Sequence, residues 1–205
     1  MQDFHSDFRE GIIVSSNNLV EIVFHGRGGQ GSVTAANLLV AAALKKKGNN
    51  GVQAFPFFGA ERRGAPVRAF ARISSDEIHL RSEIYKPDIV IVLDESIMDI
   101  VDVLKGLKKD GKILINTQKN PNDYDFSKKY KVATVDATGI AIKHDILVGG
   151  IPVVNTPMLG AVPKVLDRVN LESIQNVIKN KWLGAQGEVN IKATNDAYND
   201  VEVNF

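Results

Sequence analysis

A glycine-rich loop between an apolar run and a helix-forming run constrains this chain more than any other feature. Residues 22–47 read IVFHGRGGQGSVTAANLLVAAALKKK, with four glycines between Gly26 and Gly31. Strand, glycine loop and helix in this order form the phosphate-binding half of a βα unit, because glycine allows positive φ and close approach of a ligand. The following helix offers free N–H groups and the positive end of its dipole. The loop predicts a site for a phosphate-bearing ligand, with a tight structural turn as the alternative.

The second predicted strand argues against ordinary NAD binding. In dinucleotide-binding domains the G-x-G-x-x-G loop is followed, about 20 residues on, by an acidic side chain that holds the ribose hydroxyls. Here the strand at 52–55 runs instead into Phe57, Phe58 and Gly59, with no carboxylate at the strand end. A phosphate-bearing ligand other than NAD is therefore favoured.

Composition limits the chemistry that this chain can perform. Lys and Arg number 25 and Asp and Glu 24, so a net charge of +1 favours neither nucleic acid nor an anionic membrane as a partner. The absence of cysteine excludes disulfides, thiolate catalysis and cysteine-ligated zinc or iron–sulfur clusters on this chain. No run approaches the roughly 18 apolar residues of a membrane span, and residues 1–17 lack the pattern of a signal peptide. The sequence predicts a soluble, cytoplasmic protein.

Alternating apolar and amphipathic runs predict an α/β fold, Rossmann-like, with a mainly parallel sheet flanked by helices. Strands are expected at 19–25, 52–55, 88–93, 112–116 and 131–136, and helices at 33–47, 97–107, 137–148, 157–166, 171–182 and 189–203. The runs 67–74 and 78–82 read as an inserted antiparallel β-hairpin. The expected organisation is a polar N-terminal extension at 1–17, a Rossmann-like domain at 18–186, and a C-terminal helical tail at 187–205 that docks on the domain or a partner.

Residues that follow the strands are the candidates for ligand binding, because ligands of such sheets bind beyond the carboxyl ends of the strands. Apart from the glycine loop, they include Arg62 and Arg63 after the second strand, and Asn116 and Asn155 near later strand ends. Arginine forks pair with phosphate or carboxylate. Short amides can hydrogen-bond a ligand, although structural turn roles are equally open for the two asparagines.

Other polar side chains are expected to have structural roles. Three arginines should alternate out of the predicted hairpin into solvent or toward a partner surface: Arg68, Arg72 and Arg81. An N-cap and a first-turn acid explain Asp94 and Glu95, and helix capping or a phosphate hydrogen bond explains Ser32. The histidines have no metal-ligand spacing, so the sequence shows no catalytic or metal-binding constellation.

Four motifs, which together span most of the chain, resemble one known family. They are HGRGGQG at 25–31, QAFPFFGAERRGAPVRAFARIS at 53–74, RSEIYKPDIVIVLDESIM at 81–98 and IPVVNTPMLGAV at 151–162. They occur in the order found in the gamma subunit of 2-oxoacid:ferredoxin oxidoreductases, the pyruvate synthase group. The segment FPFFGAERRGAP resembles the pyruvate and branched-chain oxoacid branch of the family more than the 2-oxoglutarate branch.

This resemblance implies a division of labour among subunits. It places thiamine diphosphate, Mg²⁺ and [4Fe-4S] clusters on partner subunits of alpha, beta and delta type, which decarboxylate the oxoacid and pass electrons to ferredoxin. This chain would contribute to assembly and to the binding of coenzyme A, the acyl acceptor. The residues that the resemblance assigns to coenzyme A binding are Gly28, Gly29, Gln30, Gly31, Ser32, Val33, Arg62, Asn116 and Asn155.

Two other functions remain open at the level of the sequence. A purely structural subunit, with its glycine loop empty or packed on a partner, would lose assembly rather than coenzyme A affinity when the loop is changed. A stand-alone dinucleotide-binding oxidoreductase would bind NADH and not coenzyme A. In the coenzyme A hypothesis the chain positions one reactant, so no side chain here needs to act as acid, base or nucleophile.

Overall fold

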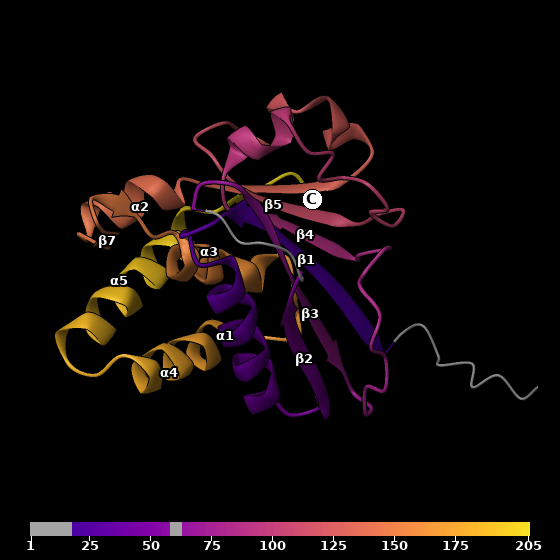
Figure 1. Cartoon of the computed structure of the whole chain (residues 1–205), viewed down its shortest axis with the longest axis horizontal. Coiled ribbons are helices and arrows are strands. Elements are labelled where there is room, and N and C mark those ends of the chain that lie inside the picture. Colours follow the sequence, from indigo (N-terminus) through magenta and orange to yellow (C-terminus); the bar gives the residue numbers. More distant parts are fainter. Residues whose placement is uncertain (1–17, 58–62) are drawn as a thin grey trace, which may run out of the picture.

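The computed structural model describes residues 18–57 and 63–205, and a seven-stranded mixed sheet forms its centre (Figure 1). The strand order is β2-β3-β1-β4-β5-β6-β9. The strands are β1 (Leu19–Arg27), β2 (Gly51–Pro56), β3 (Pro66–Ser74), β4 (Ile89–Val92), β5 (Lys112–Asn116), β6 (Lys131–Val135) and β9 (Glu202–Val203). Strands β1, β4, β5 and β6 are parallel, whereas β2, β3 and β9 pair antiparallel with their neighbours.

Helices cover one face of the sheet, and short 3-10 turns cover part of the other (Figure 1). The helices are α1 (Ser32–Lys45), α2 (Ala137–Lys143), α3 (Asn155–Ala161), α4 (Leu171–Lys181) and α5 (Ala185–Asp200). The 3-10 turns on the other side are η1 (Glu95–Asp99), η2 (Pro121–Asp123) and η3 (Asp125–Lys128), whereas η4 (Val162–Lys164) follows α3 and packs with the helices. Because successive strand residues point to opposite faces, Ile91 packs with the α-helices while Val90 and Val92 pack with Ile97 of η1.

The predicted α/β fold, with a sheet flanked by helices, is confirmed. The five strands expected from apolar runs lie within two residues of β1, β2, β4, β5 and β6. The glycine loop connects β1 to α1, and it turns sharply because Gly29 and Gly31 adopt φ values of 100° and 86°, which other residues rarely do. The loop lies at the carboxyl edge of the parallel strands, which is where ligands of such sheets bind.

The predicted β-hairpin of 67–74 with 78–82 is wrong. Strand β3 already pairs with β1 on one side and with β2 on the other, so no ladder position is left for residues 78–82. These residues run without regular secondary structure beside β2, where the Gln53 amide donates to the Ile78 carbonyl oxygen at 3.2 Å. Which edge of a strand is free is a property of the whole sheet, and an alternating pattern cannot show it.

Two predicted helices are shorter in the structure. The run 97–107 forms only η1, which ends at Asp99. Near the end of the run Gly106 adopts a φ of 80° and lies against the Tyr85 carbonyl, a position that a helix cannot take. The run 137–148 forms α2 only as far as Lys143. Its last residues form β7 (Leu147–Val148), which pairs with β8 (Ile151–Pro152) across a turn whose two glycines have positive φ.

Arg72 lies inside the molecule, which corrects the prediction that it points into solvent or toward a partner surface. It exposes 1% of its surface, and its guanidinium lies 3.0 Å from the Glu21 carboxylate and 3.4 Å from the Glu83 carbonyl oxygen. The chain after β3 passes over this face of the sheet and covers the arginine. Arg68, on the same face, is half-buried and stacks on the Phe57 ring at 4.2 Å.

The C-terminal helix α5 packs against α3 and α4, and β9 joins the sheet beside β6. Ala193 and Ala197 of α5 are fully buried, and a methyl group added at Gly160 of α3 would collide with the backbone of Thr194. The predicted boundary between residues 186 and 187 falls inside α5. The predicted polar extension at 1–17 lies outside the described residues.

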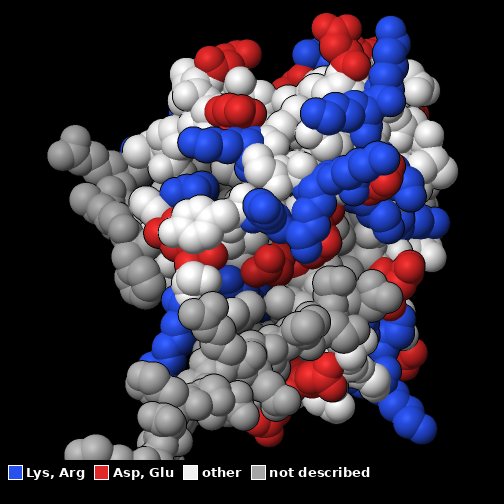
Figure 2. Space-filling model, turned by 90° about the vertical axis from the view of Figure 1, so that its right-hand side faces the viewer, with Lys and Arg blue, Asp and Glu red and all other residues white. Residues whose placement is uncertain are grey.

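The surface carries charges of both signs. Figure 2 shows Lys and Arg side chains interspersed with Asp and Glu on the face seen from the right of Figure 1. No helix in residues 18–57 and 63–205 has the length and hydropathy of a membrane span.

Candidate ligand-binding site

A pocket of about 540 Å³ opens beside the glycine loop. Residues Arg27 to Gln30 of the loop form one wall, and Arg63 and Gly64 form a second. Three apolar residues of the β7–β8 hairpin and the segment after it form the third wall: Val148, Ile151 and Val153. The pocket therefore joins a polar, glycine-lined side to an apolar side.

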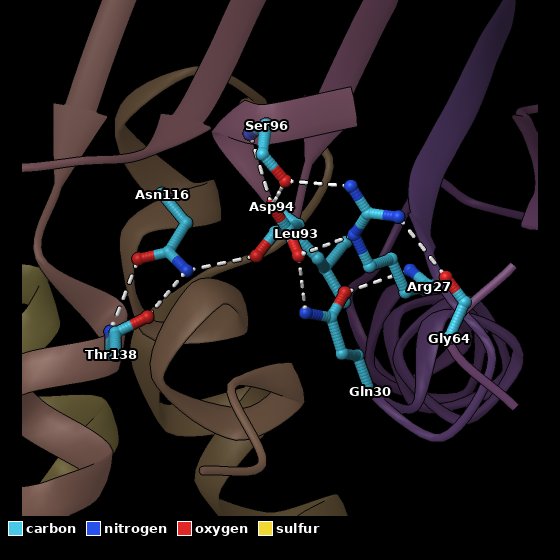
Figure 3. Close-up of polar contacts among 8 residues, drawn as sticks. All are labelled: Arg27, Gln30, Gly64, Leu93, Asp94, Ser96, Asn116 and Thr138. Carbon is cyan, nitrogen blue, oxygen red and sulfur yellow. Dashed lines mark hydrogen bonds and ion pairs between the residues drawn. The ribbon is translucent and has the colours of Figure 1, made fainter. Parts of the chain in front are cut away.

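A network of polar side chains holds the glycine loop in place (Figure 3). The Arg27 guanidinium donates to the Asp94 carboxylate at 3.1 Å, to the Ser96 hydroxyl at 2.8 Å and to the Gly64 carbonyl oxygen at 3.1 Å. The Gln30 amide donates to the same Asp94 oxygen at 2.9 Å and accepts from the Arg27 backbone N–H at 2.7 Å. Asp94, at the end of β4, thus fixes residues at both ends of the loop.

Asp94 remains charged in this position. Burial raises the pKa of its carboxyl group, but hydrogen bonds from Ser96 and Gln30 and the nearby Arg27 charge outweigh burial and lower that pKa below 3.8. The carboxylate also accepts from the Ser96 backbone N–H at 3.0 Å, so the predicted N-cap role is confirmed, although the helix it caps is the short η1.

Backbone hydrogen bonds bring Arg63 to the pocket. The Gly28 N–H donates to the Ala65 carbonyl oxygen at 2.9 Å, and the Gly64 N–H donates to the Gly28 carbonyl oxygen at 3.0 Å. The Arg63 side chain extends toward the hairpin turn, where its guanidinium would lie 3.4 Å from a methyl group added at Gly149. None of the ion pairs among the described residues involves Arg63. The other candidate arginine, Arg62, lies outside the described residues.

The N-terminus of α1 lies behind the loop without a compensating charge. No side chain of the described residues caps it, and its first turn holds no acidic residue. Ser32 exposes 2% of its surface, and its hydroxyl has no hydrogen-bond partner in the described part of the chain; it fills the space beside Gly26. Val33 packs against the core. The positive end of the helix dipole is therefore available to an anion.

Asn155, the first residue of α3, lies next to this helix end. It exposes 5% of its surface, its side-chain oxygen accepts from the Thr156 N–H at 2.8 Å, and its amide nitrogen would lie 2.6 Å from a methyl group added at Gly31. A side chain at position 31 would displace Asn155, so the two residues are structurally coupled.

Asn116 has a different environment (Figure 3). Its amide donates to the Leu93 carbonyl oxygen at 2.8 Å and to the Thr138 hydroxyl at 2.9 Å, and its side-chain oxygen accepts from the Thr138 N–H at 3.1 Å. Both amide hydrogens are occupied. The geometry therefore makes Asn116 a tie between β4, β5 and α2.

The structure brings only part of the predicted set together in the pocket wall. Gly28, Gly29 and Gln30 line it, whereas the other described members lie behind it or apart from it: Gly31, Ser32, Val33, Asn155 and Asn116. Sequence reasoning missed the hairpin wall, because a helix was expected through Val148. It also missed Arg27, although this residue lies inside the fingerprint and its position in the loop was a usable signal. No cluster of acidic and histidine side chains in the described ranges could hold a metal ion.

Comparison with known proteins gives consistent matches across nearly the whole chain. The family model described as pyruvate ferredoxin/flavodoxin oxidoreductase matches residues 21–199. A Thermococcus kodakarensis protein, the pyruvate/ketoisovalerate oxidoreductases common subunit gamma, is 52% identical over 188 residues, which cover 90% of this chain and 98% of that protein. Pyruvate synthase subunit PorC of Methanocaldococcus jannaschii is 50% identical over 183 residues, covering 89% and 97%.

Solved structures show the same fold. The pyruvate oxidoreductase subunit PORC of Thermotoga maritima has a TM-score of 0.76 and 36% identity, covering 92% of this chain and 99% of its own. A 2-oxoglutarate:ferredoxin oxidoreductase from Magnetococcus marinus, solved with 2-oxoglutarate, coenzyme A and succinyl-CoA bound, has a TM-score of 0.71. It is 15% identical, and the match covers 89% of this chain and 31% of that one, so it shows the fold alone.

Proposed function

This chain belongs to the pyruvate ferredoxin/flavodoxin oxidoreductase family as a gamma subunit, and we propose that its glycine-loop pocket binds coenzyme A. Membership makes the chain a subunit of an oxidoreductase that acts on pyruvate or a related 2-oxoacid. The ligand is the proposed part. Coenzyme A, when bound, supplies the thiol that accepts the acyl group. The residues of this chain would hold and orient it.

The proposal rests on one observation: a single pocket has one side suited to bind an anion and another side that is apolar. Gly29, the guanidinium of Arg63 and the nearby N-terminus of α1 suit the phosphate groups of the ligand. The apolar wall at Val148 and Ile151 suits its uncharged pantetheine arm. Coenzyme A combines these two chemistries, and the described residues that line the pocket include no carboxylate of the kind that NAD requires.

The contribution of this chain to turnover is then positional. Asp94 and Arg27 keep the loop in one conformation before the ligand arrives, which lowers the entropic cost of binding. The Asn155 side chain packs against Gly31. Arg62 remains in the proposed set of anion-binding residues. No side chain of the described residues needs to donate or remove a proton in this account.

The finer division of labour is also proposed. Thiamine diphosphate, Mg²⁺ and [4Fe-4S] clusters would reside on alpha-, beta- and delta-type partner subunits, with ferredoxin as the electron acceptor. The absence of cysteine supports this arrangement, because thiolates ligate such clusters. The Thermococcus kodakarensis relative is named as a subunit common to pyruvate and ketoisovalerate oxidoreductases. We therefore propose that this chain serves either oxoacid, with substrate selection on its partners.

The test compares Arg63→Ala and Arg168→Ala in the assembled complex. Arg168 lies near the amino ends of the parallel strands, away from the pocket, and serves as the matched control. A hydrogen bond to a charged group contributes about 1.5–3 kcal/mol, so the KM for coenzyme A should rise at least about tenfold in Arg63→Ala. The KM for the 2-oxoacid should not change in either variant.

Two outcomes would contradict the assignment. An unchanged KM for coenzyme A in an intact Arg63→Ala complex removes the ligand from this pocket. Loss of the subunit from the complex on size-exclusion chromatography, with normal coenzyme A dependence in what remains assembled, favours a purely structural role for the glycine loop.

A further inference from the structure

Strand β2 has a free edge in the described part of the chain. It ends the sheet order and pairs only with β3 within the described residues. The Phe57 N–H donates to the Arg68 carbonyl oxygen at 3.0 Å. Hydrogen-bonded pairs alternate in an antiparallel ladder, so Phe55 and Gln53 are the residues of β2 whose backbone groups bond to β3. The residues whose backbone groups point to the free edge are Val52, Ala54 and Pro56. Proline has no N–H, so the edge offers donors at Val52 and Ala54 and acceptors at all three.

A groove of about 780 Å³ runs along this edge. One side is formed by the four consecutive residues 52–55, and the other by residues 78–81. Because consecutive strand residues point to opposite faces, a groove that touches all four lies at the edge of the strand and not on one face of the sheet. Its floor therefore contains the unpaired backbone groups of β2.

The edge is only partly protected against strand pairing. Natural edge strands are blunted by charged residues, proline, bulges or a covering element. Strand β2, with the sequence GVQAFP, has Pro56 at one end but no charged residue, so Val52 and Ala54 keep both of their backbone groups. The rim of the groove carries one formal positive charge, that of the exposed Arg81, and the exposed His79 lies beside it. Among the described residues, the Glu77 carboxylate lies 3.8 Å from the His79 ring.

We propose that the free edge of β2 accepts an extended segment of another subunit of the oxidoreductase. The segment would add a strand to the sheet by main-chain hydrogen bonds and carry an acidic side chain opposite Arg81. The relatives of this chain are named as subunits, so partner chains exist for it to meet. A second copy fits less well, because its own groove rim carries Arg81 and offers no carboxylate to pair with this one. This groove is separate from the glycine-loop pocket, so the proposal stands or falls independently of coenzyme A.

Hydrogen exchange measures the proposed bonds directly. Exchange rates of individual backbone amides are compared between the isolated subunit and the assembled complex. The Val52 and Ala54 amides should exchange at least about tenfold more slowly in the complex, whereas Gln53 and Phe55, already bonded to β3, should change little. Equal rates for Val52 and Ala54 in both states would overturn the proposal. Protection that rises with the concentration of the isolated subunit would identify a second copy and overturn the assignment to a different subunit.

Substitution gives a second, independent readout. Ala54→Pro removes the N–H that faces the groove, whereas Ala54→Ser retains it and serves as the control. Arg81→Glu reverses the rim charge without altering the strand. Retention of the subunit in the complex, measured by size-exclusion chromatography across a dilution series, should weaken about tenfold or more for Ala54→Pro and for Arg81→Glu, and not for Ala54→Ser. Normal retention of Arg81→Glu together with unchanged amide exchange would refute the proposal even if Ala54→Pro fails to fold.

Discussion

Replacing Asp94 with asparagine tests whether the network in Figure 3 holds the glycine loop in its binding conformation. One carboxylate oxygen accepts from Arg27 and Gln30, and the other accepts from the backbone N–H and the hydroxyl of Ser96. Asparagine carries an oxygen on one side only, so its NH₂ group must face donors on the other side. No orientation of the amide satisfies both sets, although the side chain keeps its size.

The structure sets the expected magnitude. A hydrogen bond to a charged group contributes about 1.5–3 kcal/mol, and an N-cap about 1 kcal/mol. The Asp94 side chain is 21% exposed, so water compensates part of the loss. We expect the free energy of unfolding to fall by about 2 kcal/mol, which for a domain of this size lowers Tm by about 4–8 °C. Coenzyme A must then order the loop on binding, and its Kd should rise about tenfold.

The pH dependence gives a further signature of the same carboxylate. The pKa of Asp94 is lowered in the folded state, so its contribution is fully present above its ordinary value of 3.8 and is lost as pH falls below that value. The asparagine variant lacks this contribution at every pH. The stability difference between wild type and Asp94→Asn should therefore be constant from pH 5 to 8 and shrink below about pH 4.

Urea unfolding and titration with coenzyme A supply the assay, with Asp99→Asn as the control because Asp99 is exposed on the same 3-10 turn. The control should match wild type in both measurements. If Asp94→Asn also matches wild type in stability and in coenzyme A affinity, the network does not organise the loop, and the reasoning from Figure 3 is refuted.

Two further predictions concern the core. Burial, aided by the Arg68 charge, lowers the pKa of His25 from 6.5 to about 4, so the unfolded chain takes up the proton first and stability should fall by about 3 kcal/mol between pH 7 and pH 4. Urea unfolding across this range should show a flatter profile for His25→Gln, and an identical profile would contradict the assignment. A methyl group at Gly160 would lie 2.8 Å from the Thr194 Cα, so Gly160→Ala should separate α3 from α5 and cost about 2–3 kcal/mol; a Tm within 2 °C of wild type would exclude this tight packing.

Local patterns predicted much of the sheet, because each central strand is a short apolar run that must be buried on both faces. Residues 89–92 illustrate this: IVIV cannot face water on either side, and both faces of β4 are covered. The pairing of β3 could not be predicted in the same way, since one partner, β1, is distant in sequence and the other, β2, precedes β3 in the chain, so both compete with the run at 78–82 that follows it. Pairing is decided by the edges available in the assembled sheet.

The candidate site shows the same limit. The position of Gly28 to Gln30 at the pocket could be predicted, because a glycine fingerprint between a strand and a helix forms a loop at the carboxyl ends of the parallel strands. Asn116 could not be assigned, since an amide at a strand end serves a ligand or a neighbouring helix equally well, and here it bonds to Thr138. The apolar wall formed by the hairpin could not be predicted, because an apolar run followed by Gly149 and Gly150 is typical both of a helix with its C-terminal glycine and of a strand that enters a turn. Only the fold shows that the turn lies beside Arg63.

Photo-cross-linking in the assembled complex tests whether the glycine-loop pocket of this chain holds coenzyme A. The assembled complex is irradiated with coenzyme A that carries an azide on its adenine ring, and labelled peptides are identified by mass spectrometry. If the pocket holds coenzyme A, label should appear on this chain, in peptides that contain Arg27 to Gly31, Arg63 or the hairpin from Val148 to Val153. Unmodified coenzyme A should remove this label. Label confined to other subunits, with the same competition by coenzyme A, would contradict it.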